Sequence, residues 1–304
     1  MDKPKVSIVI LNWNGWEDTL ECLKSLHQTT YPNYDIIVVD NGSTDNSPKI
    51  LRRIYSGIDL IENKENIGFG EGNNVGINYA LNRGADYILL LNNDTTVDPK
   101  FLSELVEAAE GNPDAGILGS KIYYYHKPEV VWLSCYKINS LTGLCIQVDK
   151  GVDAGECDYV AGCAMLIRKE VFDKIGLFDP DFYLYGEDAE FCIRASFHRG
   201  YRILYVPTAK IYHKVSASSK SDSPIYNYYI SRNVLLLLSK NRDMVDGYRI
   251  KFLFHLLYIS GRMMKRCFLS LLNLQVKHAF QTLEATSNAI CDFYRHRYGK
   301  SNRY

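Results

Sequence analysis

The stretch Tyr87–Pro99, YILLLNNDTTVDP, decides how the rest of the chain is organised. Its first five residues are apolar without interruption, which is typical of a central parallel strand covered by helices on both faces. The apolar run stops at Asn92, and because strand side chains alternate between faces, Asn92 and Asp94 point to the same side. A carboxylate and an amide are therefore expected together where the strand ends.

Two explanations of Asp94 stay open from these residues alone. Its carboxylate oxygens suit Mg²⁺ or Mn²⁺ held against a phosphate-bearing substrate, and open α/β sheets bind ligands at the carboxyl ends of their strands. Alternatively, Asp94 only caps a polar turn, since turns rich in Asn and Asp are common.

The charge of the chain is neutral in total but uneven along its length. The 304 residues carry 35 Lys and Arg and 35 Asp and Glu. Residues 240–304 hold 12 basic and 4 acidic residues, a net charge of +8, so residues 1–239 carry −8. This asymmetry indicates that the C-terminal part meets an anionic surface. The eight cysteines are scattered without a CxxC pair, which favours reduced thiols in a cytosolic protein.

Apolar strands alternate with helical patterns through most of the chain. Strands are predicted at residues 6–11, 34–40, 58–61, 87–94 and 116–124, with helices between them. A further strand is predicted at Tyr159–Arg168, and two short strands around Pro207. Strands alternating with helices indicate βαβ units, and hence an α/β fold with a mostly parallel central sheet flanked by helices.

Three predicted strands end in polar loops, at residues 12–15, 40–45 and 92–98. These loops should gather along one edge of the sheet, which is the expected place for a nucleotide. Asp40 there either hydrogen-bonds a base or ribose, or closes an Asx-turn. A dehydrogenase is disfavoured, because the first strand is followed by NWNG and not by G-x-G-x-x-G.

A second acidic group opens a predicted helix in the stretch FYLYGEDAE. Its carboxylates at Glu187, Asp188 and Glu190 either stabilise the helix N-terminus, or one of them is kept ionised by the free N–H groups and acts as a base. His213 ends the next apolar stretch, and a lone histidine is more often structural than a ligand. Ser216–Ser223 is a candidate substrate lid.

The chain from residue 246 to 277 predicts one or two helices with two distinct faces. Such helices either lie on an anionic membrane or pack an apolar face on their own domain or a second subunit. No apolar run reaches the roughly 18 residues that cross a bilayer, and residues 294–304 are expected to fray. The basic face holds Lys251, His255, Tyr258, Arg262, Lys265 and Arg266, and the apolar face holds Leu253, Leu256, Leu257, Met264, Cys267, Leu271 and Leu274.

Seven motifs in this order resemble the family 2 glycosyltransferases with the GT-A fold, most clearly the rhamnosyltransferase-like branch of bacterial surface polysaccharide synthesis. The resemblance covers roughly residues 5–233. It implies a GT-A Rossmann-like nucleotide-diphospho-sugar transferase fold, with a catalytic domain over residues 1–239. Residues 240–304 are predicted, from their charge and helical periodicity, to form a basic amphipathic helical tail that contacts a membrane surface or another copy of the chain. The motifs are VSIVILNWNG, IIVVDNGSTDNS, NIGFGEGNNVGI, LLLNNDTTVDP, GCAMLIRKEVFDKIGLFDPDF, YGEDAEFCIRA and YYISRN.

The resemblance also implies roles for the matching residues. Asp94 is the metal-binding carboxylate of the family's Asp-x-Asp motif, and His213 helps to hold the metal or diphosphate. Asp188 is the catalytic base, with Glu187 beside it, and Asp40 binds the nucleobase. The other donor-binding residues implied are Asn12, Asn41 and Ser43 near the base, Asn73 and Asn74 near the ribose or diphosphate, Asn92 and Asn93 in the motif that corresponds to Asp-x-Asp, and Arg232 and Asn233 toward donor or acceptor phosphates. Asn92 departs from the family, since many relatives have Asp there, so metal binding is expected to depend on phosphate oxygens of the donor.

These roles imply an inverting, metal-dependent glycosyltransferase that uses Mn²⁺ or Mg²⁺. The donor would be dTDP-rhamnose or a UDP-sugar, and the acceptor a hydroxyl of a lipid-linked or polysaccharide intermediate in cell-surface glycan synthesis. Inversion is expected because the sequence shows one base and no second, nucleophilic carboxylate. A nucleotidyltransferase, which would release pyrophosphate, and a non-catalytic carbohydrate-binding protein on the same fold remain alternatives.

The expected partners are the nucleotide-sugar donor, the acceptor, an anionic membrane surface and a second copy of the chain. Nucleic acid is not expected, because the donor-site motifs account for far more of the chain than DNA binding by the tail would. Residues 1–5 are polar and lead straight into a strand, so no signal peptide is expected. We therefore expect a cytoplasmic protein, peripheral on the inner face of the cell membrane.

Overall fold

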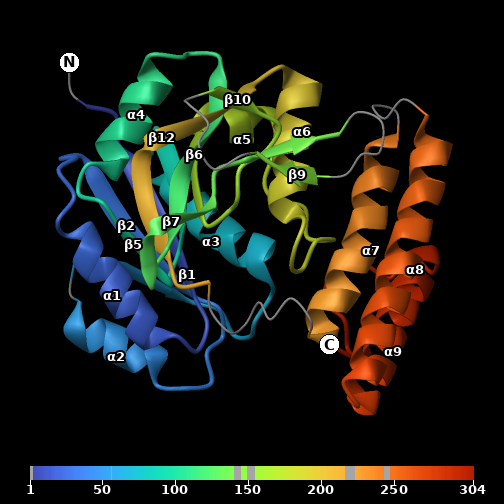
Figure 1. Ribbon diagram of the computed structural model, residues 1–304. Helices are drawn as coiled ribbons and strands as arrows, with labels where there is room; N and C mark the ends of the chain where they lie inside the picture. The colour runs from blue at the N-terminus through green and yellow to red at the C-terminus, as the bar shows by residue number, and fades with distance from the viewer. Residues whose placement is uncertain (1–2, 56, 140–144, 149–154, 216–222, 243–246) are drawn as a thin grey trace. The chain divides into compact units, whose positions relative to one another are not determined.

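The computed structural model describes residues 3–55, 57–139, 145–148, 155–215, 223–242 and 247–304 (Figure 1). The chain divides into two compact units. Unit 1 comprises residues 1–137, 146–179 and 188–215, and unit 2 comprises residues 138–145, 180–187 and 216–304. The helix Pro224–Lys240 (α7) thus groups with the helices that follow it. The assignment of residues 1–239 as the catalytic domain and 240–304 as a tail stays a prediction.

Strands and helices alternate in unit 1 as the sequence pattern predicts. The strands among the described residues are β1 (Val6–Asn12), β2 (Tyr34–Asp40), β3 (Asp59–Glu62), β4 (Tyr87–Asn92), β5 (Thr95–Val97), β6 (Ala115–Tyr124), β7 (Lys127–Leu133), β8 (Tyr136–Ile138), β9 (Cys145–Gln147), β10 (Gly155–Cys157), β11 (Ala164–Arg168) and β12 (Arg202–His213). The helices are α1 (Trp16–Leu26), α2 (Ser47–Ile54), α3 (Phe69–Asn82), α4 (Phe101–Glu110), α5 (Lys169–Ile175), α6 (Glu187–Arg199), α7, α8 (Tyr248–Leu272) and α9 (Val276–Tyr294).

The central sheet runs in the order β10-β12-β6-β11-β4-β1-β2-β3, with β5 on β12 and β7 on β6. β4, β1, β2 and β3 are parallel neighbours, and β6 is parallel to β12. β11 is inserted antiparallel between β6 and β4. The expected fold class, an α/β fold with a mostly parallel sheet flanked by helices, is confirmed.

Helices cover both faces of this sheet because its central strands are apolar on both sides. Val6, Ile8 and Ile10 of β1 pack in one buried cluster with the apolar faces of α1 and α4. The alternate residue Val9 faces α3 instead, which lies so close that a Cβ at Gly76 would come within 2.4 Å of a Val9 methyl group. Glycine at position 76 therefore permits the contact between helix and sheet.

Two strand predictions were wrong in detail. The chain around Pro207 forms one continuous strand, β12, and not two, because a register shift against β6 between Val206 and Lys210 accommodates the proline, which has no N–H to donate. The strand predicted at 159–168 begins only at Ala164, since a turn bonds the Ala164 N–H to the Ala161 carbonyl.

Unit 2 consists chiefly of α7, α8 and α9, whose shared core includes Leu235, Ile259 and Phe293. The prediction that residues 294–304 fray was wrong: the Gly299 N–H donates to the carbonyl of Asp181 at 2.9 Å, and other residues of this segment also bond within unit 2. No helix in the described part of the chain has the length and apolar character that crossing a membrane requires. The predicted lid lies outside the described residues over 216–222.

Candidate active site

The polar ends of β1, β2 and β4 lie side by side at one edge of the sheet, as predicted. Asn12 pairs in register with Asp40, and Asn92 lies opposite Leu11. Asn12 and Asp40 are both buried, and the Asn12 Nδ2 donates to Asp40 Oδ1 at 2.7 Å. This edge therefore presents buried polar groups at the point where open α/β sheets bind ligands.

The carboxylate of Asp40 already accepts hydrogen bonds within the chain. Ser43 donates to it twice, from its hydroxyl to Oδ1 at 2.6 Å and from its backbone N–H to Oδ2 at 2.9 Å. With the Asn12 amide, three of its roughly four acceptor positions are in use. The Asp40 carboxylate thus bonds within its own loop, although to the N–H three residues on and not two, as an Asx-turn requires. Its contact with a nucleobase stays a prediction.

The buried side chain of Asn41 joins β2 to the loop before α3. Its Nδ2 donates to the Gly68 carbonyl at 3.0 Å and to Asn66 Oδ1 at 3.1 Å, and its Oδ1 accepts from Asn63 Nδ2 at 3.0 Å. These bonds give Asn41 a positioning role for the loop. Its direct contact with the donor remains a prediction.

Asn73 and Asn74, on the first turns of α3, also bond inside unit 1. Asn73 Nδ2 donates to the Phe69 carbonyl at 2.9 Å. Asn74 pairs with the backbone of Phe178 in both directions, donating to its carbonyl at 2.9 Å and accepting from its N–H at 3.0 Å. Asn74 therefore holds the segment before α6 against α3, and its predicted place near the diphosphate is untested.

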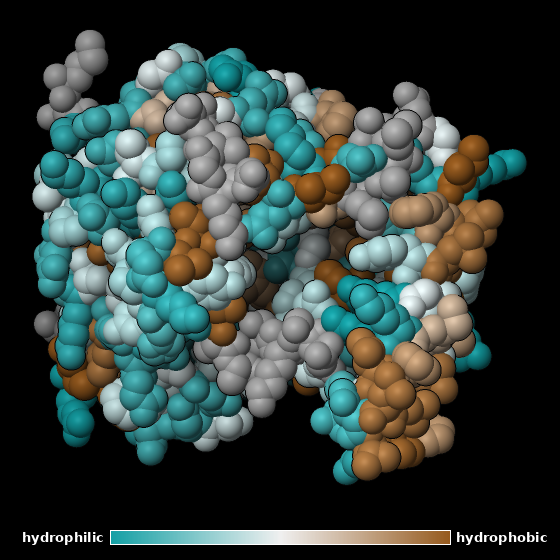
Figure 2. All heavy atoms as spheres, in the orientation of Figure 1, coloured by the Kyte–Doolittle hydropathy of each residue, from teal (hydrophilic) through white to brown (hydrophobic). Residues whose placement is uncertain are grey.

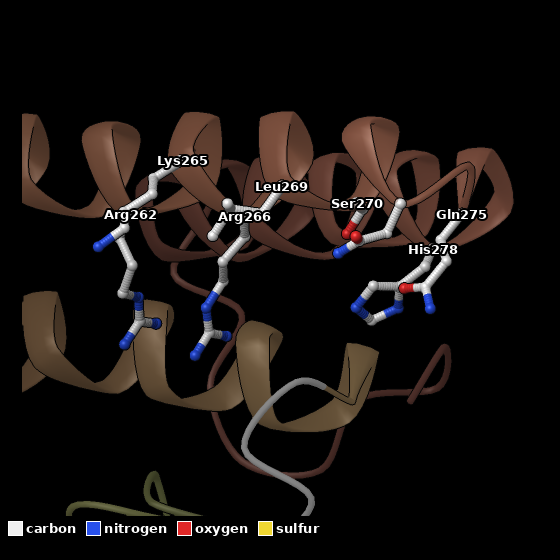
Figure 3. A pocket seen from close by; sticks show the side chains of 8 residues that line it. Arg262, Lys265, Arg266, Leu269, Ser270, Gln275 and His278 are labelled. Atoms are coloured by element: carbon white, nitrogen blue, oxygen red, sulfur yellow. The ribbon is translucent and has the colours of Figure 1, made fainter.

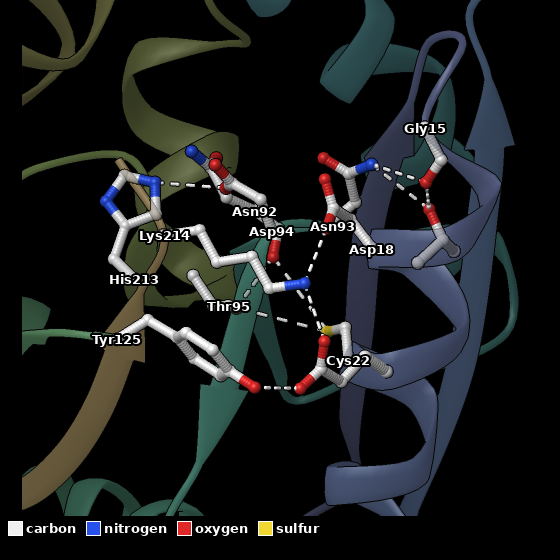
Figure 4. A network of polar contacts seen from close by, with 12 residues as sticks. Gly15, Asp18, Cys22, Asn92, Asn93, Asp94, Thr95, Tyr125, His213 and Lys214 are labelled. Carbon is white, nitrogen blue, oxygen red and sulfur yellow. Dashed lines mark hydrogen bonds and ion pairs between the residues drawn. The ribbon is translucent and has the colours of Figure 1, made fainter. Parts of the chain in front are cut away.

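The side chains at the end of β4 and just after it point in two directions. Asn93 turns toward α1, where its Nδ2 donates to the Gly15 carbonyl at 3.2 Å and to Thr19 Oγ1 at 3.1 Å. Asn92 and Asp94 lie together on the other side (Figure 4). Asp94 is buried, and its Oδ1 is 3.0 Å from Nε2 of His213, which is also buried.

Asp94 and His213 fit two positions of a divalent ion. Neighbouring ligands of an octahedral ion at about 2.1 Å are about 3.0 Å apart, which is the separation of Asp94 Oδ1 and His213 Nε2. Among the described residues, no group of three or more His, Cys, Asp or Glu side chains is arranged to hold a metal. The remaining ligands would then come from outside the protein.

A network that the sequence analysis missed lies beside this pair (Figure 4). Lys214 Nζ is 2.5 Å from Asp18 Oδ1 and 2.6 Å from Glu21 Oε2, and the Tyr125 hydroxyl also bonds to Glu21. Burial lowers the pKa of Lys214, but its bonds to the two carboxylates outweigh burial and raise the pKa overall. The network ties the end of β12 to α1 and so positions His213. The only signal of this network in the sequence is the spacing of Asp18 and Glu21, which places both carboxylates on one face of α1. Nothing in the sequence relates them to Lys214.

Asp188 is the second residue of α6 and is held by backbone donors. Its Oδ1 accepts from the Ala189 N–H at 2.8 Å, and its Oδ2 accepts from the Gly162 N–H at 3.2 Å. Burial raises the pKa of its carboxyl group despite these hydrogen bonds. Such a carboxylate is a stronger base than an exposed one. Glu187, the first residue of α6, is also buried.

The other acidic residue of this helix start has a structural role. Glu190 accepts two hydrogen bonds from Arg194, at Oε1 from Nε and at Oε2 from Nη2, each at 2.8 Å. Arg194 in turn donates to the Leu177 carbonyl at 2.9 Å. Glu190 therefore helps to fix the segment that precedes α6.

Arg232 and Asn233 lie in unit 2, and their described bonds remain inside that unit. Arg232 is 1% exposed and donates to the Gly299 carbonyl at 2.8 Å and to Asn233 Oδ1 at 3.0 Å. Asn233 Nδ2 donates to the Leu184 and Tyr185 carbonyls at 2.9 and 2.7 Å. These contacts are structural, and contact with phosphates stays a prediction for both residues.

The mostly parallel sheet with helices on both faces is the GT-A fold. Two solved structures share this fold. The first is GalNAc-T7 with UDP, GalNAc and Mn²⁺, which has a TM-score of 0.63 and 18% identity over 77% of this chain. The second is the Pyrobaculum calidifontis mannosyltransferase PcManGT with GDP-Man and Mn²⁺, which has a TM-score of 0.59 and 12% identity over 96% of this chain. The match covers 48% of the first neighbour's chain and 88% of the second's.

The family model of glycosyl transferase family 2 matches residues 7–176, and this chain belongs to that family. It is 27% identical to the dTDP-rhamnosyl transferase RfbF of Shigella flexneri, over 77% of this chain and 79% of that protein. It is 25% identical to the N-acetylglucosaminyl-diphospho-decaprenol L-rhamnosyltransferase of Mycobacterium tuberculosis, over 66% of this chain and 73% of that protein. The predicted family is thus confirmed, and the protein is a glycosyltransferase.

Proposed function

We propose that this glycosyltransferase transfers a sugar, with inversion, from a nucleoside-diphosphate donor to an acceptor hydroxyl. The observation that supports this most is the Asp94–His213 pair at the carboxyl edge of a GT-A sheet, 3.0 Å apart and buried. One nitrogen and one oxygen ligand at this spacing suit Mn²⁺ or Mg²⁺, with phosphate oxygens of the donor completing the coordination of the ion. Such an ion, when bound, would neutralise the charge of the departing diphosphate.

Asp188 is the catalytic base in this proposal. Its carboxylate takes the proton from the acceptor hydroxyl while the hydroxyl oxygen attacks the anomeric carbon and the bond to the diphosphate breaks. The backbone N–H groups of Gly162 and Ala189 hold both oxygens of Asp188 and so fix its orientation. A single displacement that uses one base inverts the anomeric centre, whereas retention would require a nucleophilic carboxylate as well.

The relatives' names suggest the substrates. RfbF is a dTDP-rhamnosyl transferase, and the mycobacterial relative acts on an N-acetylglucosaminyl-diphospho-decaprenol. We infer dTDP-rhamnose as the first candidate donor, with UDP-sugars next, and a lipid-linked or polysaccharide acceptor used at the cytoplasmic face of the membrane.

The base is tested by Asp188→Asn, with the exposed Asp173→Asn as the matched control. We expect turnover to fall by at least about 10²–10⁴-fold, the range attributed to general base catalysis, while donor affinity is kept. In the wild type, activity should rise with pH as Asp188 loses its proton, and its raised pKa moves this rise above the ordinary range of Asp. Near-normal turnover by Asp188→Asn would remove this residue from the role.

Donor and metal are tested by thermal unfolding with dTDP, UDP and GDP and their sugars, with and without Mn²⁺. A ligand at 100 times its Kd adds about 2.7 kcal/mol to the free energy of unfolding. We expect a metal-dependent shift with one nucleotide, reduced in Asp94→Asn. Release of pyrophosphate from a nucleoside triphosphate would instead support a nucleotidyltransferase.

A further inference from the structure

The outer face of α8 is apolar along almost its whole length and is exposed. At 100° per residue most of its exposed apolar side chains fall within one stripe, which also contains Gly261, while the exposed Tyr258 and Leu269 lie to one side of it. Apolar side chains gather visibly over the helical unit in Figure 2. Past the end of α8, Leu274 is 88% exposed, and Phe280 of α9 is also exposed. On α8 it comprises Ile250, Leu253, Phe254, Leu257, Met264, Phe268, Leu271 and Leu272; together with Leu274 and Phe280 we call it the apolar stripe.

The opposite face of α8 is the one that packs inside unit 2. Ile259 and Ser270 are buried on it, and Cys267 Sγ donates to the Ala279 carbonyl of α9 at 3.4 Å. Part of the basic face predicted from the sequence also turns inward, since His255 is buried and Arg266 bonds to Asn227 of α7. Packing within unit 2 therefore does not cover the apolar stripe.

A cationic pocket reaches from Lys265, which lies beside the apolar stripe, to Ser270 on the inner face of α8. It has a volume of about 420 Å³ and is lined by Arg262, Lys265, Arg266, Leu269, Ser270, Asn273, Gln275 and His278, with no carboxylate among them (Figure 3). Arg262 and Arg266 project toward α7, and the pocket closes against the start of α9 (Figure 3). Burial and the nearby charge of Arg266 lower the pKa of Arg262. An anion in this pocket would relieve that repulsion.

The charge of the sequence segment that carries most of the stripe has one sign. From Gly247 to Leu283 the sequence contains six Lys and Arg residues and no Asp or Glu. Lys265 and Lys277 are exposed. An exposed apolar stripe with a cationic flank is the pattern of a helix that lies in the plane of a membrane interface.

We propose that the apolar stripe is a docking face for an anionic phospholipid bilayer, and that the cationic pocket receives a headgroup phosphate. The apolar side chains would enter the boundary between headgroups and acyl chains, while Arg262, Lys265 and His278 meet the phosphates just above it. This proposal does not depend on the proposed transfer reaction, because none of its residues belongs to the candidate active site.

A second copy of the chain fits this face less well. A twofold dimer would bring the same surface of each copy together, and so place the cationic flanks, which contain no Asp or Glu over residues 247–283, close to each other. An anionic bilayer supplies the missing negative charge, at about 1 kcal/mol per Lys or Arg near its surface.

The test is sedimentation of the full-length chain with vesicles of phosphatidylcholine, with and without phosphatidylglycerol. Two exposed positions of the face are changed, each with a matched control in unit 1. Phe268→Ser is compared with Phe197→Ser, since the two phenylalanines are 61% and 64% exposed. Lys265→Gln is compared with Lys174→Gln, which removes the same charge from another exposed site.

We expect the wild type to bind vesicles that contain phosphatidylglycerol more tightly than neutral ones, and less tightly as salt is raised. Phe268→Ser should weaken binding about tenfold, as expected when one large apolar side chain no longer enters the lipid. Lys265→Gln should weaken binding to the anionic vesicles roughly fivefold, and both controls should bind as the wild type does.

Three outcomes would overturn the proposal. These are no binding to either vesicle, equal losses in Phe268→Ser and Phe197→Ser, or a dimer in analytical ultracentrifugation that Phe268→Ser dissociates while vesicle binding is absent. The changed side chains are exposed, so we expect the thermal unfolding of each variant to match that of the wild type. Measuring it verifies that each variant is folded.

Discussion

Arg232→Met separates a structural from a donor-binding role for the most buried cation of unit 2. The guanidinium group stacks against the rings of Tyr228 and Tyr229, with its carbon 5.4 and 5.0 Å from the ring centroids. Its hydrogen bonds tie α7 to the segment that follows α9. If Arg232 acts only through these bonds, its replacement should destabilise the segment after α9 and leave the affinity for the donor unchanged.

The magnitude follows from two bonds of normal length, to the Gly299 carbonyl at 2.8 Å and to Asn233 Oδ1 at 3.0 Å. Hydrogen bonds to charged groups contribute about 1.5–3 kcal/mol each, so the two together represent about 3–6 kcal/mol. Methionine keeps part of the packing and avoids the cost of burying a charge. We therefore expect the free energy of unfolding of unit 2 to fall by about 3 kcal/mol, since breaking a buried polar network costs of that order.

Hydrogen exchange over residues 295–304 measures this loss locally. A loss of about 3 kcal/mol corresponds to roughly 10²-fold faster exchange of protected amides. The Gly299 N–H, bonded to the Asp181 carbonyl, is the reporter, and the exposed Arg295→Met is the matched control. Unchanged exchange at Gly299 together with weaker binding of the nucleotide donor would refute the structural argument and support phosphate contact by Arg232.

Two further predictions concern unit 1. Asn74→Ala removes both side-chain partners of the Phe178 backbone, so it should lower the free energy of unfolding by about 2 kcal/mol. Urea titration measures this loss, and an unchanged urea midpoint would mean that water replaces the Asn74 amide group. The pKa of Glu21 is lowered from its ordinary value of 4.5, chiefly by Lys214, so its contribution to stability is present above pH 4.5 and is lost as the pH falls through the lowered value. Lys214→Met should therefore reduce the loss of thermal stability on acidification below pH 4.5, whereas the exposed Lys64→Met, which removes a charge that does not act on Glu21, should not. Equal acid sensitivity in both variants would contradict the assignment.

The sequence by itself determined the alternation of strands and helices and the polar strand ends. Apolar periodicity is a local property, so the strand that begins at Tyr87 and the polar residues that end it could be predicted from adjacent residues in the sequence. The same alternation placed Asn92 and Asp94 on one side and Asn93 on the other, as the structure shows. It also established the class, because parallel strands joined by helices allow few topologies.

Only the tertiary structure decided which distant residues meet. Asn74 and Phe178 are 104 residues apart in the chain, and their pairing depends on how α3 and the segment before α6 pack. His213 reaches Asp94 because β12 pairs with β5 in register, which no local pattern specifies. The tail shows the same limit: its periodicity predicted two faces of α8, but packing against α7 and α9 determined that part of the basic face turned inward and the apolar stripe stayed exposed.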